Sequence, residues 1–219
     1  SAIKVLVPPD AKGTLFKWVA ILTGSKNALK GAGFFLGSFL LATAGFSGAL
    51  WIMAGALAIV WLGSWASLPR EMGKSKVKAG WSDLLSKSRE INVLCLARFF
   101  LFGARDIWFV VGVPVFLRGV LGWSFAQVGA FMAFWVIGYG IIQGAAPAIL
   151  RGRAPAGGTA SAIAFVLAVV AAAIPLGLAA GMPANVVIVG GLAIFGAVFA
   201  LNSAVHSYLI LDYTDGDKV

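Results

Sequence analysis

The sequence has little charge and almost no cysteine. Only 11% of its 219 residues are charged, whereas a soluble domain has about 25%. This shortage excludes an ordinary soluble protein, because too little polar surface remains to keep a folded chain in water. The single cysteine, Cys95, excludes an internal disulfide bond and any metal site built from several thiolates. We expect neither a metal site nor a cofactor.

The uncharged runs are long enough to cross a membrane. Hydrophobic residues make up 60% of the chain. A spanning helix needs about 20 apolar residues, and the uncharged stretches 31–68 and 154–211 each have room for two such helices. Turn residues at 45–48 and 181–185 divide these stretches. We predict an all-α membrane helix bundle with six spans, at about residues 27–45, 48–68, 91–117, 125–150, 159–180 and 185–211.

The net charge of +9 indicates an orientation in the membrane. With six spans, both termini and the loops 69–90 and 151–158 lie on one side, and that side carries 14 of the 17 Lys and Arg residues. Positively charged connections stay in the cytoplasm, so both ends of the chain are predicted to be cytoplasmic. No nucleic-acid partner is expected, because no basic patch is combined with aromatic residues on a soluble module.

The segments at the two ends and in the middle of the chain suggest its organisation. Residues 14–22 are predicted to form a short amphipathic helix lying on the cytoplasmic face. The loop 69–90 is the longest hydrophilic stretch and the best domain boundary. The chain starts within a loop and stops at 215–219 as though another helix followed, so we expect a fragment of a longer protein.

Three charges fall inside the predicted span 91–117. Arg105 and Asp106 lie about 21–23 Å along it, and Arg98 is on nearly the same face, about 10 Å before Arg105. Charges at membrane depth usually face a cavity, and two guanidiniums can hold a ligand with two separated anionic groups. The alternatives are an ion pair from Arg105 to another helix and a cytoplasm-facing Arg98. Asp106 is expected to be a proton site or a counter-ion; adjacent side chains point about 100° apart, which disfavours a pair with Arg105.

Other polar side chains at membrane depth are expected to line the same cavity. They follow helical spacing on the fourth and sixth predicted spans: Trp135, Tyr139 and Gln143, and Asn202 and His206. Packing is the alternative for the aromatic residues, and a structural or gating role is the alternative for His206. Lys26 and Lys30, at the start of the first span, either form a cytoplasmic anion funnel or are ordinary cytoplasmic cations.

Glycine and proline patterns predict details of helix packing. Pro114 and Pro175 predict kinks inside spans. Glycines four residues apart allow helices to approach closely; they occur at Gly33 and Gly37, Gly140 and Gly144, and Gly177 and Gly181.

One sequence feature is typical of an enzyme. Ser47 in a Gly-Phe-Ser-Gly turn, together with the single histidine His206, is similar to the Ser–His dyad of rhomboid intramembrane proteases. The predicted topology places Ser47 in an outer turn and His206 about 30 Å away at the inner side. A nucleophile and its base must approach to about 3 Å, so we predict that the chain is not an enzyme.

Four blocks of sequence resemble one family of transporters. They are residues 22–31 (LTGSKNALKG), 96–114 (LARFFLFGARDIWFVVGVP), 135–140 (WVIGYG) and 205–211 (VHSYLIL). In this order they resemble the organoarsenical efflux permeases of the major facilitator superfamily, the ArsJ type.

The resemblance implies a fold and a function. It implies a twelve-helix transporter in a bacterial inner membrane, of which this chain covers about helices five to ten: the end of one half (1–68), the inter-half loop (69–90) and the start of the other half (91–219). The family exports 1-arseno-3-phosphoglycerate, a product of glyceraldehyde-3-phosphate dehydrogenase acting on arsenate, by alternating access. Arg98 and Arg105 would bind this anion. The alternatives are an exporter of another small molecule, such as a drug or sugar, and a non-transporting membrane protein or the protease.

Overall fold

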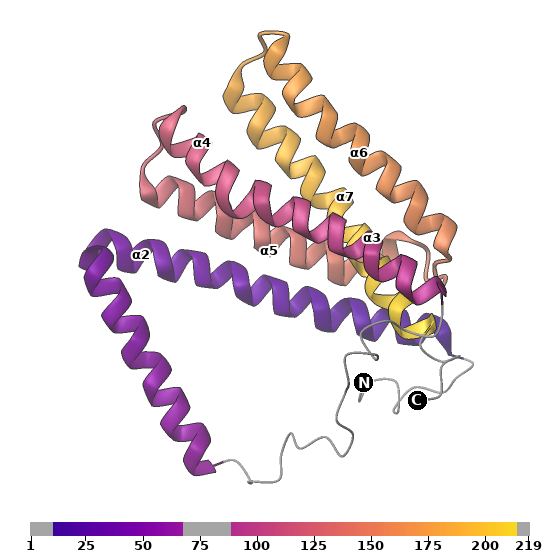
Figure 1. Ribbon diagram of the computed structural model, residues 1–219, viewed down its shortest axis with the longest axis horizontal. Helices are drawn as coiled ribbons and strands as arrows, with labels where there is room; N and C mark the ends of the chain where they lie inside the picture. Colours follow the sequence, from indigo (N-terminus) through magenta and orange to yellow (C-terminus); the bar gives the residue numbers. More distant parts are fainter. Residues whose placement is uncertain (1–10, 68–88, 214–219) are drawn as a thin grey trace.

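The computed structural model describes residues 11–67 and 89–213, and every regular element within these ranges is helical. In chain order the elements are α2 (Lys12–Ser67), α3 (Arg89–Asp106), the π-helix η2 (Ile107–Gly112), α4 (Val113–Gly119), α5 (Phe125–Ile149), α6 (Gly157–Ala179) and α7 (Ala184–Tyr213). The elements α3, η2 and α4 follow one another as a single rod (Figure 1). We call them the α3–α4 rod.

The described residues contain five helices that are long and apolar enough to cross a membrane, with the α3–α4 rod counted as one. At most 33% of the residues in their most apolar windows are buried inside the protein. The remaining apolar side chains therefore face outwards, where a lipid environment would cover them. These helices are those of a membrane protein.

The longest helix, α2, is interrupted once. At Gly45 the backbone has φ 66° and ψ −179°, a conformation that side-chain-bearing residues rarely adopt. The interruption lies in the predicted turn 45–48 and divides α2 into two arms. Figure 1 shows the second arm turning away from the other helices, and Ala49 is its only buried residue.

The first arm begins earlier than predicted. Helix α2 starts at Lys12, and residues 14–22 are its first turns, so the prediction of a separate surface helix is wrong. Leu15, Phe16 and Val19 are buried in a cluster that includes Tyr208 of α7. The apolar face expected to enter lipid packs instead against another helix. The side chains of Lys12 and Asp212 form an ion pair of 2.9 Å at the same end.

The other helix boundaries lie within two residues of the predicted ones. Ser124 and Gln127 form a capping box at the start of α5: the Ser124 hydroxyl accepts a hydrogen bond from the Gln127 N–H, and the Gln127 side chain accepts one from the Ser124 N–H. The predicted loop 69–90 lies outside the described residues except for Arg89 and Glu90, which belong to α3. The residues before 11 and after 213 also lie outside them.

The two prolines have different surroundings. Pro114 follows one residue after the π-helix, whose C-cap residue Val113 donates its N–H to the Trp108 carbonyl, five residues back. Pro114 has no N–H to donate to the Val110 carbonyl, and the wider π-helical hydrogen bonding ends just before this missing bond. Helix α6 continues without interruption through Pro175.

Helices α2 and α5 make the most extensive contact between any two described elements. They meet backbone to backbone: a Cβ added at Gly24 would lie 2.5 Å from the Gly140 carbonyl oxygen and 2.6 Å from the Gly144 nitrogen. The predicted close packing of Gly140 and Gly144 is thus confirmed, with Gly24 on the opposing helix. A Cβ at Gly33 would meet nothing within 4 Å in the described part of the chain.

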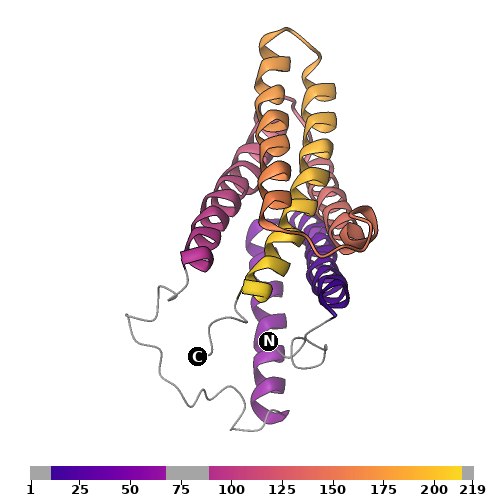
Figure 2. The ribbon, with the colours of Figure 1, turned by 90° about the vertical axis from the view of Figure 1, so that its right-hand side faces the viewer.

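The remaining helices are arranged around α5 and α7. Figure 2 shows α6 and α7 as a neighbouring antiparallel pair, joined by a turn. Helix α7 also contacts α2, α3 and α5. It is therefore the element that joins the α6 side of the bundle to the α2–α5 pair.

The glycine contact between α2 and α5 predicts a contrast between two substitutions. Gly24→Ala is expected to destabilise the protein by about 1–3 kcal/mol, because the new methyl group overlaps backbone atoms that cannot move aside. Gly33→Ala makes the same chemical change where there is free space and serves as the control. Thermal unfolding in detergent should show a lowered midpoint for Gly24→Ala alone. Equal midpoints for the two variants would contradict the packing described here.

Candidate substrate pocket

A pocket of about 500 Å³ lies between α2, the α3–α4 rod and α5. We call it the central pocket. Its polar and aromatic lining includes Asn27, Lys30, Arg105, Asp106, Trp135 and Tyr139. Three helices therefore contribute side chains that lie far apart in the sequence. Lys30, Arg105 and Tyr139 lie about 21–27 Å from the starts of α2, the α3–α4 rod and α5, near the middle of the first arm of α2, of the rod and of α5.

Arg105 forms an ion pair with its neighbour Asp106. The Nε atom of Arg105 donates to Oδ1 of Asp106 at 2.7 Å. We expected the two side chains to diverge, and this expectation is wrong because the long Arg105 side chain bends back to the carboxylate. The Asp106 side chain is 55% exposed and that of Arg105 only 22%. Asp106 is therefore the counter-ion of Arg105 and the more exposed partner of the pair.

The two arginines share one aromatic ring. The guanidinium carbon of Arg98 lies 4.8 Å from the centroid of Phe102, and that of Arg105 lies 4.9 Å from it. They therefore lie on one face of α3, as their spacing predicted. Arg98 also donates from Nη1 to the hydroxyl of Ser207 in α7 at 3.4 Å. Arg98 is thus turned toward α7, whereas Arg105 lines the central pocket.

Stacked aromatic rings form one wall of the central pocket. The rings of Phe109 and Trp135 stack with centroids 4.0 Å apart, and Trp135 stacks on Tyr139 at 5.7 Å. The indole Nε1 of Trp135 donates to the Leu192 carbonyl at 2.6 Å, which anchors the wall to α7. The Tyr139 hydroxyl is buried and has no hydrogen-bond partner among the described residues.

A chain of side-chain hydrogen bonds lies behind the pocket. Asn27 donates from Nδ2 to Oε1 of Gln143 at 2.6 Å, and Gln143 donates from Nε2 to the hydroxyl of Ser203 at 3.0 Å. These bonds link α2, α5 and α7. Gln143 is 1% exposed, so it holds Asn27 in place and does not line the cavity as predicted. Asn27 was not predicted, although it lies between the two lysines that were.

The remaining predicted residues lie elsewhere. Asn202 is fully buried in α7, and neither polar atom of its side chain has a hydrogen-bond partner within the described ranges. His206 lines a different pocket, which also includes Arg89. Lys26 and Lys30 are both exposed, and of the two only Lys30 lines the central pocket. Because α2 begins at Lys12, neither lysine lies at the start of the helix. Only Lys30 lines the same pocket as Arg105.

Ser47 and His206 lie at opposite ends of the bundle. Ser47 follows the Gly45 interruption, about 50 Å along α2 from Lys12. Lys12 is paired with Asp212, which is less than two turns from His206 on α7. This separation gives no support to a Ser–His dyad.

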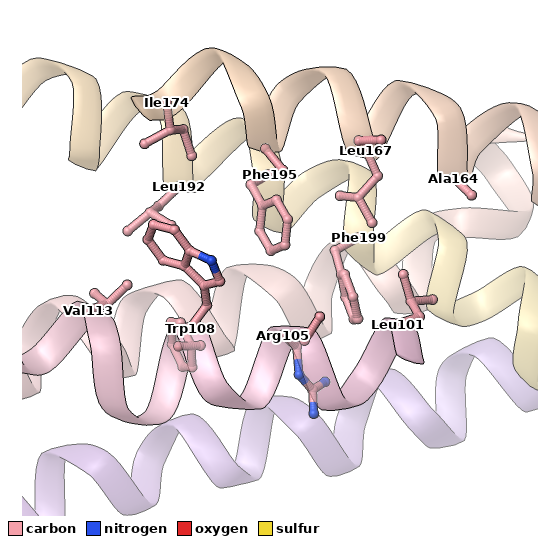
Figure 3. Close-up of a pocket in the computed structure, with 14 residues that line it drawn as sticks. Leu101, Arg105, Trp108, Val113, Ala164, Leu167, Ile174, Leu192, Phe195 and Phe199 are labelled. Atoms are coloured by element: carbon pink, nitrogen blue, oxygen red, sulfur yellow. The ribbon is translucent and has the colours of Figure 1, made fainter. Parts of the chain in front are cut away.

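A second, apolar pocket lies on the other side of Arg105. Figure 3 shows the guanidinium of Arg105 pointing away from the apolar side chains that line this second pocket, such as Leu192 and Phe195. The guanidinium still contacts one lining residue, since its central carbon lies 5.3 Å from the ring centroid of Phe199. The positive charge is directed to the α2 side, where the central pocket lies.

No protein-family model matches the chain, and no curated protein or solved structure matches it either. The resemblance to organoarsenical permeases therefore stays a prediction.

The hydrogen bonds behind the pocket predict a measurable coupling between helices. A double-mutant cycle of Asn27→Ala and Gln143→Ala should give a coupling energy of about 0.6 kcal/mol or more, a usual value for hydrogen bonds between membrane helices. The matched cycle uses Arg98→Ala and Ser207→Ala, whose hydrogen bond is longer at 3.4 Å, and should give a smaller value. Stability is measured by unfolding in mixed micelles. Additive losses at Asn27 and Gln143 would contradict the network.

Proposed function

We propose that the protein is an efflux transporter with six spans in a bacterial inner membrane and with both ends in the cytoplasm. The two arms of α2 supply two of the spans: they extend about 50 Å and 33 Å on either side of Gly45, and each is long enough for roughly 30 Å of hydrocarbon. The other four helices supply one span each.

The substrate that we propose is an anionic organoarsenical, 1-arseno-3-phosphoglycerate. The observation that supports an anion is the presence of Lys30 and Arg105 in one pocket with a single acid, Asp106. Glyceraldehyde-3-phosphate dehydrogenase would form this substrate in the cytoplasm from arsenate, and export would confer arsenate resistance. The identity of the substrate rests on the sequence resemblance, whereas its charge is supported by the pocket.

The pocket suggests how such a substrate is held. Arg105 can bind a phosphate or arsenate group through two parallel hydrogen bonds, whereas Lys30 acts as a point charge for the second anionic group. Lys30 would thus bind the second anionic group, a role that the sequence predicted for Arg98. The Arg98 side chain instead donates a hydrogen bond to Ser207. The aromatic wall limits access of water and strengthens both attractions.

Binding would also change the ion pair of Arg105. The incoming oxyanion competes with the Asp106 carboxylate for the guanidinium, and Asp106 is released toward the pocket. The two cations come from opposite sides of the predicted inter-half boundary, Lys30 from α2 and Arg105 from α3. A substrate that contacts both draws the halves together, which is the coupling that alternating access requires.

The alternative substrates differ in charge. A neutral sugar gains little from two cations, and a cationic drug is repelled by them, so the pocket favours an anion over either. An exporter of a different anion remains the nearest alternative. Competition with 3-phosphoglycerate and with inorganic phosphate separates these substrates, and a non-transporting protein would show no uptake of any of them.

Replacing the two pocket cations should impair transport. Arg105→Gln and Lys30→Gln are each expected to raise the KM by about tenfold or more, since each removes a charged contact worth roughly 1.5–3 kcal/mol. The assay uses everted vesicles from cells that express the complete gene encoding this chain. Arsenic uptake is measured with arsenate, glyceraldehyde 3-phosphate, the dehydrogenase and its nicotinamide cofactor outside.

Lys26→Gln is the matched control, because it removes the same charge one helical turn away from Lys30, outside the lining of the central pocket. Its KM should stay within about twofold of the wild type, as expected for a surface charge. Omitting the dehydrogenase tests whether free arsenate is carried. Full arsenate tolerance and uptake in Arg105→Gln at equal expression would show that the binding role is wrong.

Asp106→Asn separates the two roles open to this carboxylate. If Asp106 is only a competing counter-ion, the KM should fall by about threefold, because the pair is partly exposed and contributes well under 1 kcal/mol. If Asp106 carries a coupling proton, uptake driven by a pH gradient should be lost while exchange of substrate across the membrane persists. The KM, the uptake and the exchange are all measured in the same vesicles, with and without an imposed pH gradient.

A further inference from the structure

Two pockets lie between the α3–α4 rod and α6, with residues of α7 lining both: the apolar pocket of about 280 Å³ beside Arg105, and one of about 520 Å³ at the Arg89 end. Ala164 lines both pockets, so they adjoin each other on α6. Figure 3 shows the apolar part, with α6 on one side and the rod on the other. We call the whole the lateral groove. It is separate from the central pocket, which lies between the rod, α2 and α5.

The greater part of the lateral groove suits a hydrocarbon chain. Its walls are aliphatic and aromatic, and include Leu101, Trp108, Leu167, Ile174, Leu192 and Phe195. Arg105 is the one charged residue among the described residues that line this part; its guanidinium points away from Leu192 and Phe195 (Figure 3) and lies 5.3 Å from the centroid of Phe199. The stretch of α6 from Ser161 to Ile174 extends about 20 Å, slightly more than the roughly 15 Å of one hydrocarbon leaflet.

The other end of the groove is polar. Arg89, Glu90, Ser161 and His206 line it, and Arg89 is exposed at the first turn of α3. Arg153 is exposed in the turn that leads into α6, and among the described residues Glu90 is the one acid that lines this opening. Glu90 disfavours a second negative charge, and the opening therefore fits one phosphate group. Apolar walls that end at a cationic opening match an amphiphile with an anionic head.

We propose that the lateral groove binds one phospholipid with a singly charged anionic head group, such as phosphatidylglycerol. One acyl chain lies along α6 and the rod, and the phosphate accepts hydrogen bonds from Arg89 and His206. Arg89 provides the preference for an anionic lipid, since one arginine near a membrane surface contributes about 1 kcal/mol. The proposal does not depend on the transport function.

Native mass spectrometry of the whole chain in a neutral detergent tests this assignment. The probes are dioleoyl phosphatidylglycerol, dioleoyl phosphatidylcholine and glycerol 3-phosphate, each titrated separately. One phosphatidylglycerol should bind, about fivefold more tightly than phosphatidylcholine, which is the ratio that 1 kcal/mol provides. Glycerol 3-phosphate, which has the head-group phosphate without acyl chains, should not bind measurably.

Two pairs of variants locate the lipid. Ala171→Phe places a ring in the groove and should weaken binding of both lipids by tenfold or more, whereas Ala172→Phe, exposed on α6 outside the lining, should not. Arg89→Gln should abolish the preference for phosphatidylglycerol, whereas Lys17→Gln, an exposed cation on α2, should leave it. The four substitutions are at exposed positions, so folding should be preserved.

Several results would overturn the proposal. Unchanged lipid binding in Ala171→Phe, or equal affinity of the wild type for the two lipids, would show that the groove does not select an anionic lipid. Tight binding of glycerol 3-phosphate would make the opening a site for free phosphate. Absence of any lipid adduct would mean that another part of the protein covers the groove.

Discussion

The close approach of the α2 and α5 backbones is the contact on which the central pocket depends. Gly24 and Gly140 allow the helices to touch without intervening side chains. Asn27, one turn beyond Gly24, can then reach Gln143 at 2.6 Å, and Lys30, one turn further, faces the pocket that contains Arg105. A side chain at Gly24 would separate the helices and break the hydrogen bond, because its strength falls steeply with distance.

The helices themselves could largely be predicted from composition. Long stretches without charge, interrupted by glycine and proline, define helices whatever their neighbours are, and the ends of α5, α6 and α7 followed from such signals. The start of α2 could not be predicted in this way. An amphipathic stretch such as 14–22 buries the same apolar face in lipid or against another helix, and the sequence carries no information that separates these environments.

The site was predictable in its chemistry but only partly in its geometry. Arg105 and Tyr139 were found because charge and hydroxyl groups are costly at membrane depth and are seldom placed there without a role. The partners of these residues depend on how each helix is rotated about its axis. That rotation decides that Lys30 and not Arg98 shares the pocket, and that Gln143 points to Asn27 and Ser203.

The length of the helices has a consequence for where the pocket lies in the bilayer. The first arm of α2 and the whole of α7 measure about 50 Å and 45 Å, well beyond a hydrocarbon layer of roughly 30 Å. Tilting absorbs part of the excess, and the rest must project as a short stalk. The charged end marked by the Lys12–Asp212 pair is the one suited to water. The projecting residues do not count toward the depth of the pocket in the membrane. The central pocket therefore lies closer to the membrane surface on the Lys12–Asp212 side than its distance from the start of each helix suggests.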